Sequence, residues 1–179
     1  MKNPFIEMTG FIHSVQQYDE ELLFEIRDGK DPERITNLVL NDDSLLTSMS
    51  GEAIEVSNEL NGSYITAFVN GRKPVFAFYP PRFYPELVAI RIGEEFGFVS
   101  VGDFNENLIS GELDLKLMIS EETEIINCLG ESLDEQQIKN NLAFVYYTRS
   151  TRSIPAQASV SKVIVYVDPF GEMQDNLRE

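Results

Sequence analysis

Short runs of apolar residues, many of them alternating with polar ones, recur along the whole chain, with turn residues between them. Runs of this length that are rich in β-branched and aromatic residues are typical of β-strands. The first half of the chain contains five such runs, at residues 5–15, 22–26, 35–40, 64–69 and 87–92. The second half contains four, at residues 98–104, 113–119, 142–148 and 163–167. The pattern predicts an all-β protein with minor helix.

One segment carries a helix signal. Ser132 and Glu135 have the spacing of a capping box, which predicts a short helical turn that continues to about Lys139. The corresponding segment in the first half is residues 55–60, and it is followed by the turn sequence Asn61-Gly62.

The two halves of the chain repeat each other in the same order. The matched segments are 40–44 with 119–123, 51–52 with 130–131, 67–69 with 145–147, 79–81 with 154–156, and 88–90 with 163–165. An internal duplication explains this order better than two unrelated β segments of similar composition. Units with several short strands and turns between them are typical of small barrels or sandwiches. We therefore predict two tandem small OB-like β barrels, at residues 1–93 and 94–168, followed by a polar tail at 169–179.

Charge and composition limit the compartment and the partners. The net charge of −16 opposes binding to nucleic acid or to anionic membranes, since such binding depends on Lys and Arg. No apolar run approaches the roughly 20 residues that cross a bilayer. Residues 1–7 contain no apolar run of the secretory kind. Cys128 is the only cysteine, so an internal disulfide is excluded, which suits a reducing compartment. We expect a soluble, cytoplasmic protein.

The positive charge gathers on one feature of each repeat, the loop before the last strand together with that strand. Residues 72–91 and residues 148–167 each carry a net charge of +3, which leaves −22 for the rest of the chain. One hypothesis is that these loops bind a carboxylate or a phosphate. Its candidate residues are Arg72, Lys73, Arg82, Arg149, Arg152, Ser150 and Ser153. The alternative is that the basic loops pack against acidic surface of the same chain.

The segment from residue 70 to residue 86 combines four prolines with several aromatic residues. Four prolines exclude a central strand, because proline cannot donate to a ladder. The aromatic residues of interest are Phe78, Tyr79, Phe83 and Tyr84. They are either a rigid cap on the open end of the barrel or a surface on which a partner docks.

Three stretches resemble a known family. These are Thr66-Ala67-Phe68, Tyr79-Pro80-Pro81 and residues 148–157. They resemble a family of small, uncharacterised bacterial proteins with a duplicated β-barrel unit, and the similarity covers residues 5–167. Related units occur in exported proteins labelled copper amine oxidase-like, where the label belongs to a neighbouring domain. The resemblance implies neither an activity nor a catalytic residue.

Several chemistries are excluded by the residues that the chain lacks. His13 is the only histidine and Cys128 the only cysteine, so zinc and copper sites of the usual kind cannot form within one chain. Neither a P-loop nor a Rossmann fingerprint is present, and we predict no cofactor and no catalytic residue. The acidic pairs at 42–43 and 121–122 occupy equivalent turns, and we interpret them as solvated charges rather than calcium ligands.

These observations favour a non-enzymatic binding or protein-interaction module whose partner is a protein or a small anionic ligand. One alternative is a hydrolase or lyase that uses carboxylates, Tyr and Arg. Two carboxyl groups about 5 to 10 Å apart in a pocket, one with a strongly raised pKa, would support that enzyme. Another alternative is a structural subunit that forms homo-oligomers through exposed edge strands.

Overall fold

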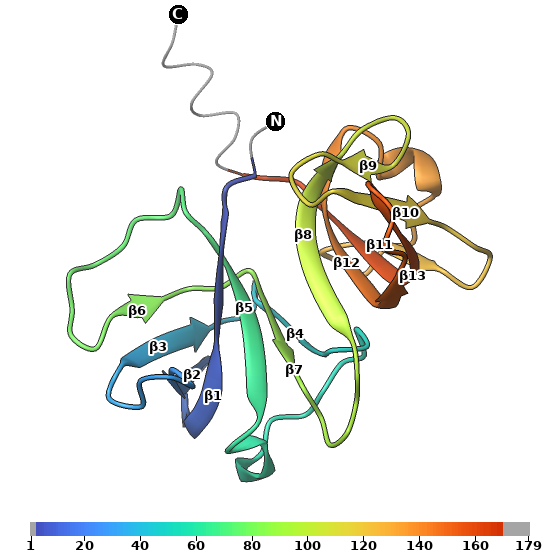
Figure 1. The fold of residues 1–179 in the computed structure, drawn as a ribbon. Coiled ribbons are helices and arrows are strands. Elements are labelled where there is room, and N and C mark those ends of the chain that lie inside the picture. The colour runs from blue at the N-terminus through green and yellow to red at the C-terminus, as the bar shows by residue number, and fades with distance from the viewer. Residues whose placement is uncertain (1–2, 170–179) are drawn as a thin grey trace, which may run out of the picture. The chain divides into compact units, whose positions relative to one another are not determined.

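The computed structural model describes residues 3–169, and this part of the chain is all-β with two sheets. The contacts divide it into two compact units. The first unit is residues 4–95, and the second is residue 3 with residues 96–169. Each unit curls into a small OB-like barrel (Figure 1), as the sequence predicts. The predicted polar tail, apart from residue 169, lies outside the described residues.

The first unit contains one seven-stranded sheet in the order β4-β7-β5-β1-β2-β3-β6. Its strands are β1 (Phe5–Tyr18), β2 (Glu21–Arg27), β3 (Ile35–Leu40), β4 (Leu45–Ser48), β5 (Tyr64–Asn70), β6 (Arg82–Phe83) and β7 (Leu87–Ile90). Its only described helix is the 3-10 turn η1 (Asn58–Leu60).

The second unit contains a six-stranded sheet in the order β8-β12-β13-β10-β9, with β11 paired to β13. Its strands are β8 (Phe98–Phe104), β9 (Ile109–Ser110), β10 (Leu115–Met118), β11 (Glu124–Asn127), β12 (Asn141–Ser150) and β13 (Ala156–Tyr166). The 3-10 turn η2 (Glu135–Gln137) precedes β12.

The two units share one pairing scheme. The antiparallel pairs β1·β5 and β5·β7 correspond to β8·β12 and β12·β13, and the parallel pair β4·β7 corresponds to β11·β13. Ala67 lies opposite Val88, and Val145 lies opposite Val163. Residues 67 and 88 are those that the sequence repeat matches with 145 and 163. This shared scheme is the result that an internal duplication predicts.

The acidic turns of the two repeats also have the same hydrogen bonds. In the first turn, the Asn41 side chain accepts from the Asp43 N–H at 3.0 Å, and the Ser44 hydroxyl accepts from the Asn41 N–H at 3.2 Å. In the second turn, the equivalent bonds are Glu122 N–H to Ser120 Oγ at 3.3 Å and Ser120 N–H to Thr123 Oγ1 at 3.0 Å. The acidic side chains at both tips are exposed.

The units differ where the last barrel strand closes the sheet. In the second unit β13 is continuous, and it pairs with β10 through its first part and with β11 through its second. In the first unit the same path is broken into β6 and β7, and β6 pairs with β3 over only two residues. Pro81 and Pro85 flank β6, and neither can donate to a ladder. The first barrel is therefore more open, and β6 is an edge strand, consistent with the prediction from the prolines.

Each barrel encloses its own apolar core, and one apolar side chain at each 3-10 turn is buried in it. Leu60 is buried in the core of the first unit, and Ile138, next to η2, is buried in that of the second. The turn η2 begins with a capping box of Asp134 and Gln137. The helical turn is therefore confirmed, but the predicted capping pair of Ser132 and Glu135 is wrong. Ser132 is instead held in an isolated β-bridge with Ile126.

The helices of residues 3–169 are single short turns. None of them is long and apolar enough to cross a membrane.

Candidate functional site

A hollow of about 660 Å³ lies in the first unit, where β2 ends between its two neighbours. Arg27, the last residue of β2, pairs with Phe11 of β1 on one side and with Ile35 of β3 on the other. Beyond this point β1 continues back to Phe5 without a partner on this side, whereas β2 and β3 are joined by the turn at residues 28–34, and the hollow lies beside this part of β1. Its lining comes from β1, the end of β2, the turn between β2 and β3, β3, one residue of β5, the loop before β6, and β6: Ile6, Glu7, Met8, Thr9, Ile26, Asp28, Arg34, Ile35, Thr36, Leu38, Ile65, Phe78, Tyr79, Pro81 and Phe83.

The floor of the hollow is apolar. Ile65 and Leu38 belong to the buried core of the first barrel, and Met8 and Phe83 pack against that core. The hollow is therefore an opening onto the core at the place where the barrel is incompletely closed. A cavity of this size that combines an apolar floor with polar groups has the character of a ligand site.

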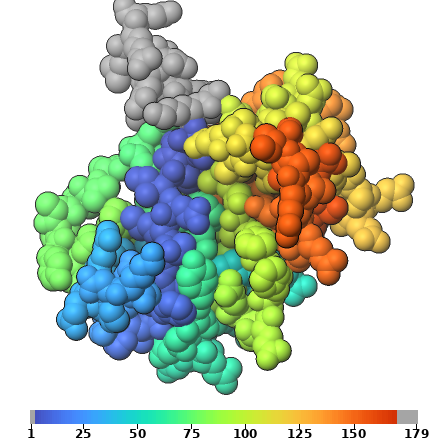
Figure 2. All heavy atoms as spheres, viewed as in Figure 1, coloured from blue at the N-terminus to red at the C-terminus, as the bar shows by residue number. Residues whose placement is uncertain are grey.

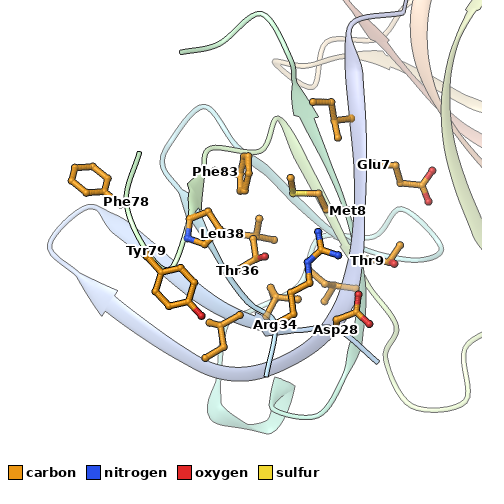
Figure 3. Close-up of a pocket in the computed structure, with 15 residues that line it drawn as sticks. Glu7, Met8, Thr9, Asp28, Arg34, Thr36, Leu38, Phe78, Tyr79 and Phe83 are labelled. Carbon is orange, nitrogen blue, oxygen red and sulfur yellow. The ribbon is translucent and has the colours of Figure 1, made fainter. Parts of the chain in front are cut away.

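Arg34 is the positively charged residue of this lining. Its side chain is exposed, and within residues 3–169 no ion pair is formed by it. Figure 3 shows the guanidinium group reaching across the hollow toward Met8 and Thr9. Its hydrogen-bond donors are thus directed at a space that a ligand can enter.

Asp28 lies beside Arg34 but has a structural role. One of its carboxylate oxygens accepts from the backbone N–H groups of Lys30 at 2.7 Å and Asp31 at 3.2 Å. These two bonds, together with the positive charges of Arg34 and Lys30, hold the pKa of Asp28 below its ordinary value. Asp28 therefore stays ionised and fixes the turn that begins after β2.

Glu7 is the second carboxylate of the lining. Partial burial raises the pKa of Glu7 above its ordinary value. Figure 3 shows this side chain directed away from the hollow, on the opposite side of β1 from Met8. Glu7 and Asp28 therefore do not face a common space, which is what an acid and base pair would require.

The aromatic loop, residues 70–86, is partly cap and partly surface. Phe83 packs against the core and Tyr84 is half-buried. Tyr79 is 85% exposed, and Phe78 is also exposed. In Figure 2 the green atoms of this loop form an arm along the margin of the first unit. The hypothesis of a cap therefore fits Phe83 and Tyr84, and the hypothesis of an exposed surface fits Phe78 and Tyr79.

The basic residues near this loop differ in availability. Lys73 Nζ lies 2.5 Å from Glu86 Oε1, and both side chains are mostly buried, so this lysine is already paired. The side chain of Arg72 is half-buried. Arg82 is exposed, and its guanidinium carbon lies 5.9 Å from the centre of the Phe78 ring, a cation–π distance.

In the second unit, Arg149 and Arg152 lie at the end of β12 and in the loop that follows. Both are exposed, and neither forms an ion pair within the described residues. Ser150 is exposed as well.

The hydroxyl groups of that loop bond within it. Ser153 donates to the Pro155 carbonyl at 2.8 Å, so Thr151 is the donor in its 2.7 Å bond with Ser153. An anion there would therefore be held mainly by the two arginines, and the anion site stays a prediction.

The remaining reactive side chains lie apart from the hollow. His13 is half-exposed, with Nε2 3.8 Å from a carboxylate oxygen of Glu25. The Cys128 sulfur lies 3.7 Å from the Val165 carbonyl oxygen. In the part of the chain that the structure describes, no three His, Cys, Asp or Glu side chains gather as a metal-binding group.

The sequence pattern indicates the aromatic side of the hollow but not Met8, Asp28, Arg34 and Thr36. The turn sequence from Asp28 to Pro32 marks the end of β2, and this was the available signal. It places Asp28 and Arg34 at the two ends of one loop, but it does not show that β1 passes beside them.

The fold and the hollow together define a class: a protein of two tandem OB-like barrels, of which the first carries a cavity of ligand size. No protein-family model matches the chain, and no curated protein matches it.

Proposed function

We propose that this protein is a non-enzymatic binding module whose first barrel holds its ligand in the hollow between β1 and β3. The observation that carries this proposal is an opening of about 660 Å³ with an apolar floor and with the exposed Arg34 directed into it. Apolar contact supplies affinity in such a site, and a single charged group supplies orientation.

The ligand is of mixed character. Met8, Leu38 and Phe83 offer apolar contact, so part of the ligand is apolar. Arg34 offers donors that match a carboxylate or a phosphate, so another part is acidic. A protein segment or a small anionic ligand fits both demands. The net charge of −16 argues against nucleic acid and anionic membranes, and the single cysteine supports a cytoplasmic location.

The carboxylate-dependent hydrolase or lyase is less well supported. The lining includes two carboxylates whose pKa values shift in opposite directions, but Glu7 is directed away from the hollow and Asp28 is bound to its own turn. An acid and a base that act on one substrate must both reach it.

A capture experiment from a lysate of the native host tests the module. The immobilised wild-type protein is compared with a Phe78→Ala/Tyr79→Ala double variant, whose side chains line the hollow and are exposed. We expect the proteins and metabolites that the wild type retains to be depleted at least about tenfold by the double variant, which corresponds to 1.4 kcal/mol. Mass spectrometry measures the retained set.

Tyr18→Ala is the matched control for this experiment. Tyr18 is exposed in the same unit and does not line the hollow. We expect it to retain the wild-type set. An identical set from the wild type and the double variant would show that the hollow is not the binding site.

A second candidate function is anion binding by the second barrel. It is favoured by the exposure of Arg149 and Arg152 without carboxylate partners in the described residues, whereas Lys162 in the same unit lies 3.4 Å from Glu124 Oε2. An exposed arginine contributes only about 1 kcal/mol or less in water, so the two would have to share the anion.

Melting temperatures in phosphate test this site. At about 50 mM phosphate, compared with sodium chloride of equal ionic strength, we expect the melting temperature of the wild type to rise by a few degrees. An Arg149→Ala/Arg152→Ala double variant should lose this rise, and Arg91→Ala, an exposed arginine of the first unit, should keep it. A rise that persists in the double variant, or none in the wild type, would refute the site.

A further inference from the structure

Strand β1 leaves part of one backbone edge unpaired. Its first half, from Phe5 to Phe11, pairs with β5, and its second half, from Phe11 onward, pairs with β2. The edge of the first half that faces away from β5 lies beyond the end of β2.

The direction of the backbone groups follows from the hydrogen bonds at both ends of this segment. The Pro4 carbonyl accepts from the Gly71 N–H at 2.8 Å, and the Ile12 N–H donates to the Ser63 carbonyl at 3.0 Å, so the even-numbered residues bond toward β5. In an antiparallel strand, alternate residues direct their N–H and C=O groups to opposite edges. Glu7 and Thr9 therefore direct theirs away from β5.

The opposite strand supports this assignment. The carbonyls of Tyr64 and Phe68 accept from Arg91 and Glu86, on the β7 side of β5. The odd-numbered residues of β5 are thus the ones that bond toward β1, and in the register they face the even-numbered residues of β1.

Within residues 3–169, no backbone hydrogen bond is formed with Glu7 or Thr9 on the edge of β1 that faces away from β5.

This free edge borders the hollow. Four consecutive residues of β1, from Ile6 to Thr9, line it, although consecutive side chains of a strand point to opposite faces. A cavity that contacts all four must face the edge of the strand. The rest of the lining comes from the turn between β2 and β3, from β3 and from the loop before β6.

We propose that the hollow accepts an extended segment of a partner protein, which adds to β1 as a strand and continues the line of β2. The inference rests on the proposed function and specifies its ligand. The segment would exchange backbone hydrogen bonds with Glu7 and Thr9, present an acidic side chain to Arg34 and place apolar side chains against Met8, Phe78 and Tyr79. Strand addition of this kind takes its affinity from main-chain bonds and its specificity from alternate side chains.

Charge supports a protein segment with an acidic residue as the occupant. Arg34 and Arg82 are exposed, and within the described residues neither forms an ion pair, although the charge of Arg34 also acts on the neighbouring Asp28. One acidic residue at the correct position can pair with Arg34, whereas the repeated phosphates of a nucleic acid would be repelled by the net charge of −16.

The first test removes one donor of the free edge. Peptides that bind the protein are selected from a displayed library of random 12-residue sequences, and the selected peptide is synthesised with a fluorophore. Proline is tolerated on an edge whose N–H the fold does not use, so Thr9→Pro removes a donor needed only by the added strand. We expect Thr9→Pro to weaken binding at least about tenfold, or 1.4 kcal/mol, as measured by fluorescence anisotropy. Thr9→Ala keeps the N–H and should change the affinity by less than about threefold.

The second test leaves the protein unchanged and therefore does not depend on the folding of Thr9→Pro. The selected peptide is N-methylated at one residue at a time. A bound strand bonds through alternate residues, so we expect losses of about tenfold or more at every second position and small losses between them.

The outcomes separate this inference from the proposed function. A peptide that loses affinity on Phe78→Ala/Tyr79→Ala, but shows no alternation and no effect of Thr9→Pro, binds in the hollow without adding as a strand. That result would refute the inference and leave the binding module standing. The inference would also be refuted if no selected peptide bound the Phe78→Ala/Tyr79→Ala variant more weakly than the wild type. The lysate capture would then still decide whether the protein is a binding module. A dimer of this protein that Thr9→Pro dissociates would show that a second copy, and not a partner, occupies the edge.

Discussion

Replacing Gly10 with alanine should lower the melting temperature of the first unit by about 10 °C or more. A methyl group at this position would overlap Ile26 Cγ2 and would lie 2.7 Å from the carbonyl oxygen of Arg27. The second contact is with backbone, which cannot rotate away. Gly10 precedes the residue at which β1 changes partners from β5 to β2, so the strand is held by both neighbours and cannot move aside.

The size of the effect follows from the cost of overpacking. Inserting a methyl group into a packed site costs about 1–3 kcal/mol, and the backbone contact places Gly10→Ala at the upper end. For a unit of this size, each kcal/mol changes the melting temperature by roughly 4–8 °C. Scanning calorimetry measures the shift.

Gly111→Ala is the control, since a Cβ there has no neighbour within 4 Å. It should change the melting temperature by less than about 2 °C. Equal melting temperatures for the two variants would mean that β1 and β2 do not approach as closely as the structure shows.

Replacing Ile138 with alanine should destabilise the second unit by about 3 kcal/mol. Ile138 is 0% exposed and packs in the core of that unit directly after the turn η2. The turn holds its backbone in place, because the Ile138 N–H donates to the Glu135 carbonyl at 3.2 Å. The shortened side chain would therefore leave a cavity that the barrel cannot easily close, and Ile→Ala changes of this kind cost about 2–5 kcal/mol.

Urea unfolding followed by circular dichroism measures this change. The control is Leu129→Ala in the same unit, since Leu129 is 84% exposed. It should change the free energy of unfolding by no more than about 0.5 kcal/mol. A loss for Ile138→Ala as small as that of the control would show that the turn does not close the barrel.

The strands that the sequence predicted well are those with strong local patterns. The ranges 35–40 and 98–104 agree with β3 and β8 at both ends. In these segments β-branched and aromatic residues recur, so local propensity and burial favour the same structure. The repeat was also readable, since equivalent turns require the same kinds of side chain.

The elements that the sequence missed lack such a pattern. Strands β4, β9 and β11 have four residues or fewer, and β6 has two. The first part of β13 alternates small and polar residues, and it becomes a strand because β10 and β12 lie on either side of it. Short strands of this kind are defined by their partners, which are distant in the sequence.

The sequence by itself determined the class of the fold, the duplication and the absence of a central strand at residues 70–86, because these depend on local pattern, turn chemistry and proline, whereas which rings of that loop are exposed was decided by the tertiary structure. The candidate site depended on the tertiary structure. The hollow exists because β2 ends at Arg27 while β1 extends beyond it to Phe5, and because β6 pairs over only two residues. Met8, Arg34 and Tyr79 are far apart in the chain and meet only through that arrangement. The free edge at Glu7 and Thr9 is likewise a property of strand pairing, since any strand residue carries the same backbone groups and only its neighbours decide which of them remain unbonded.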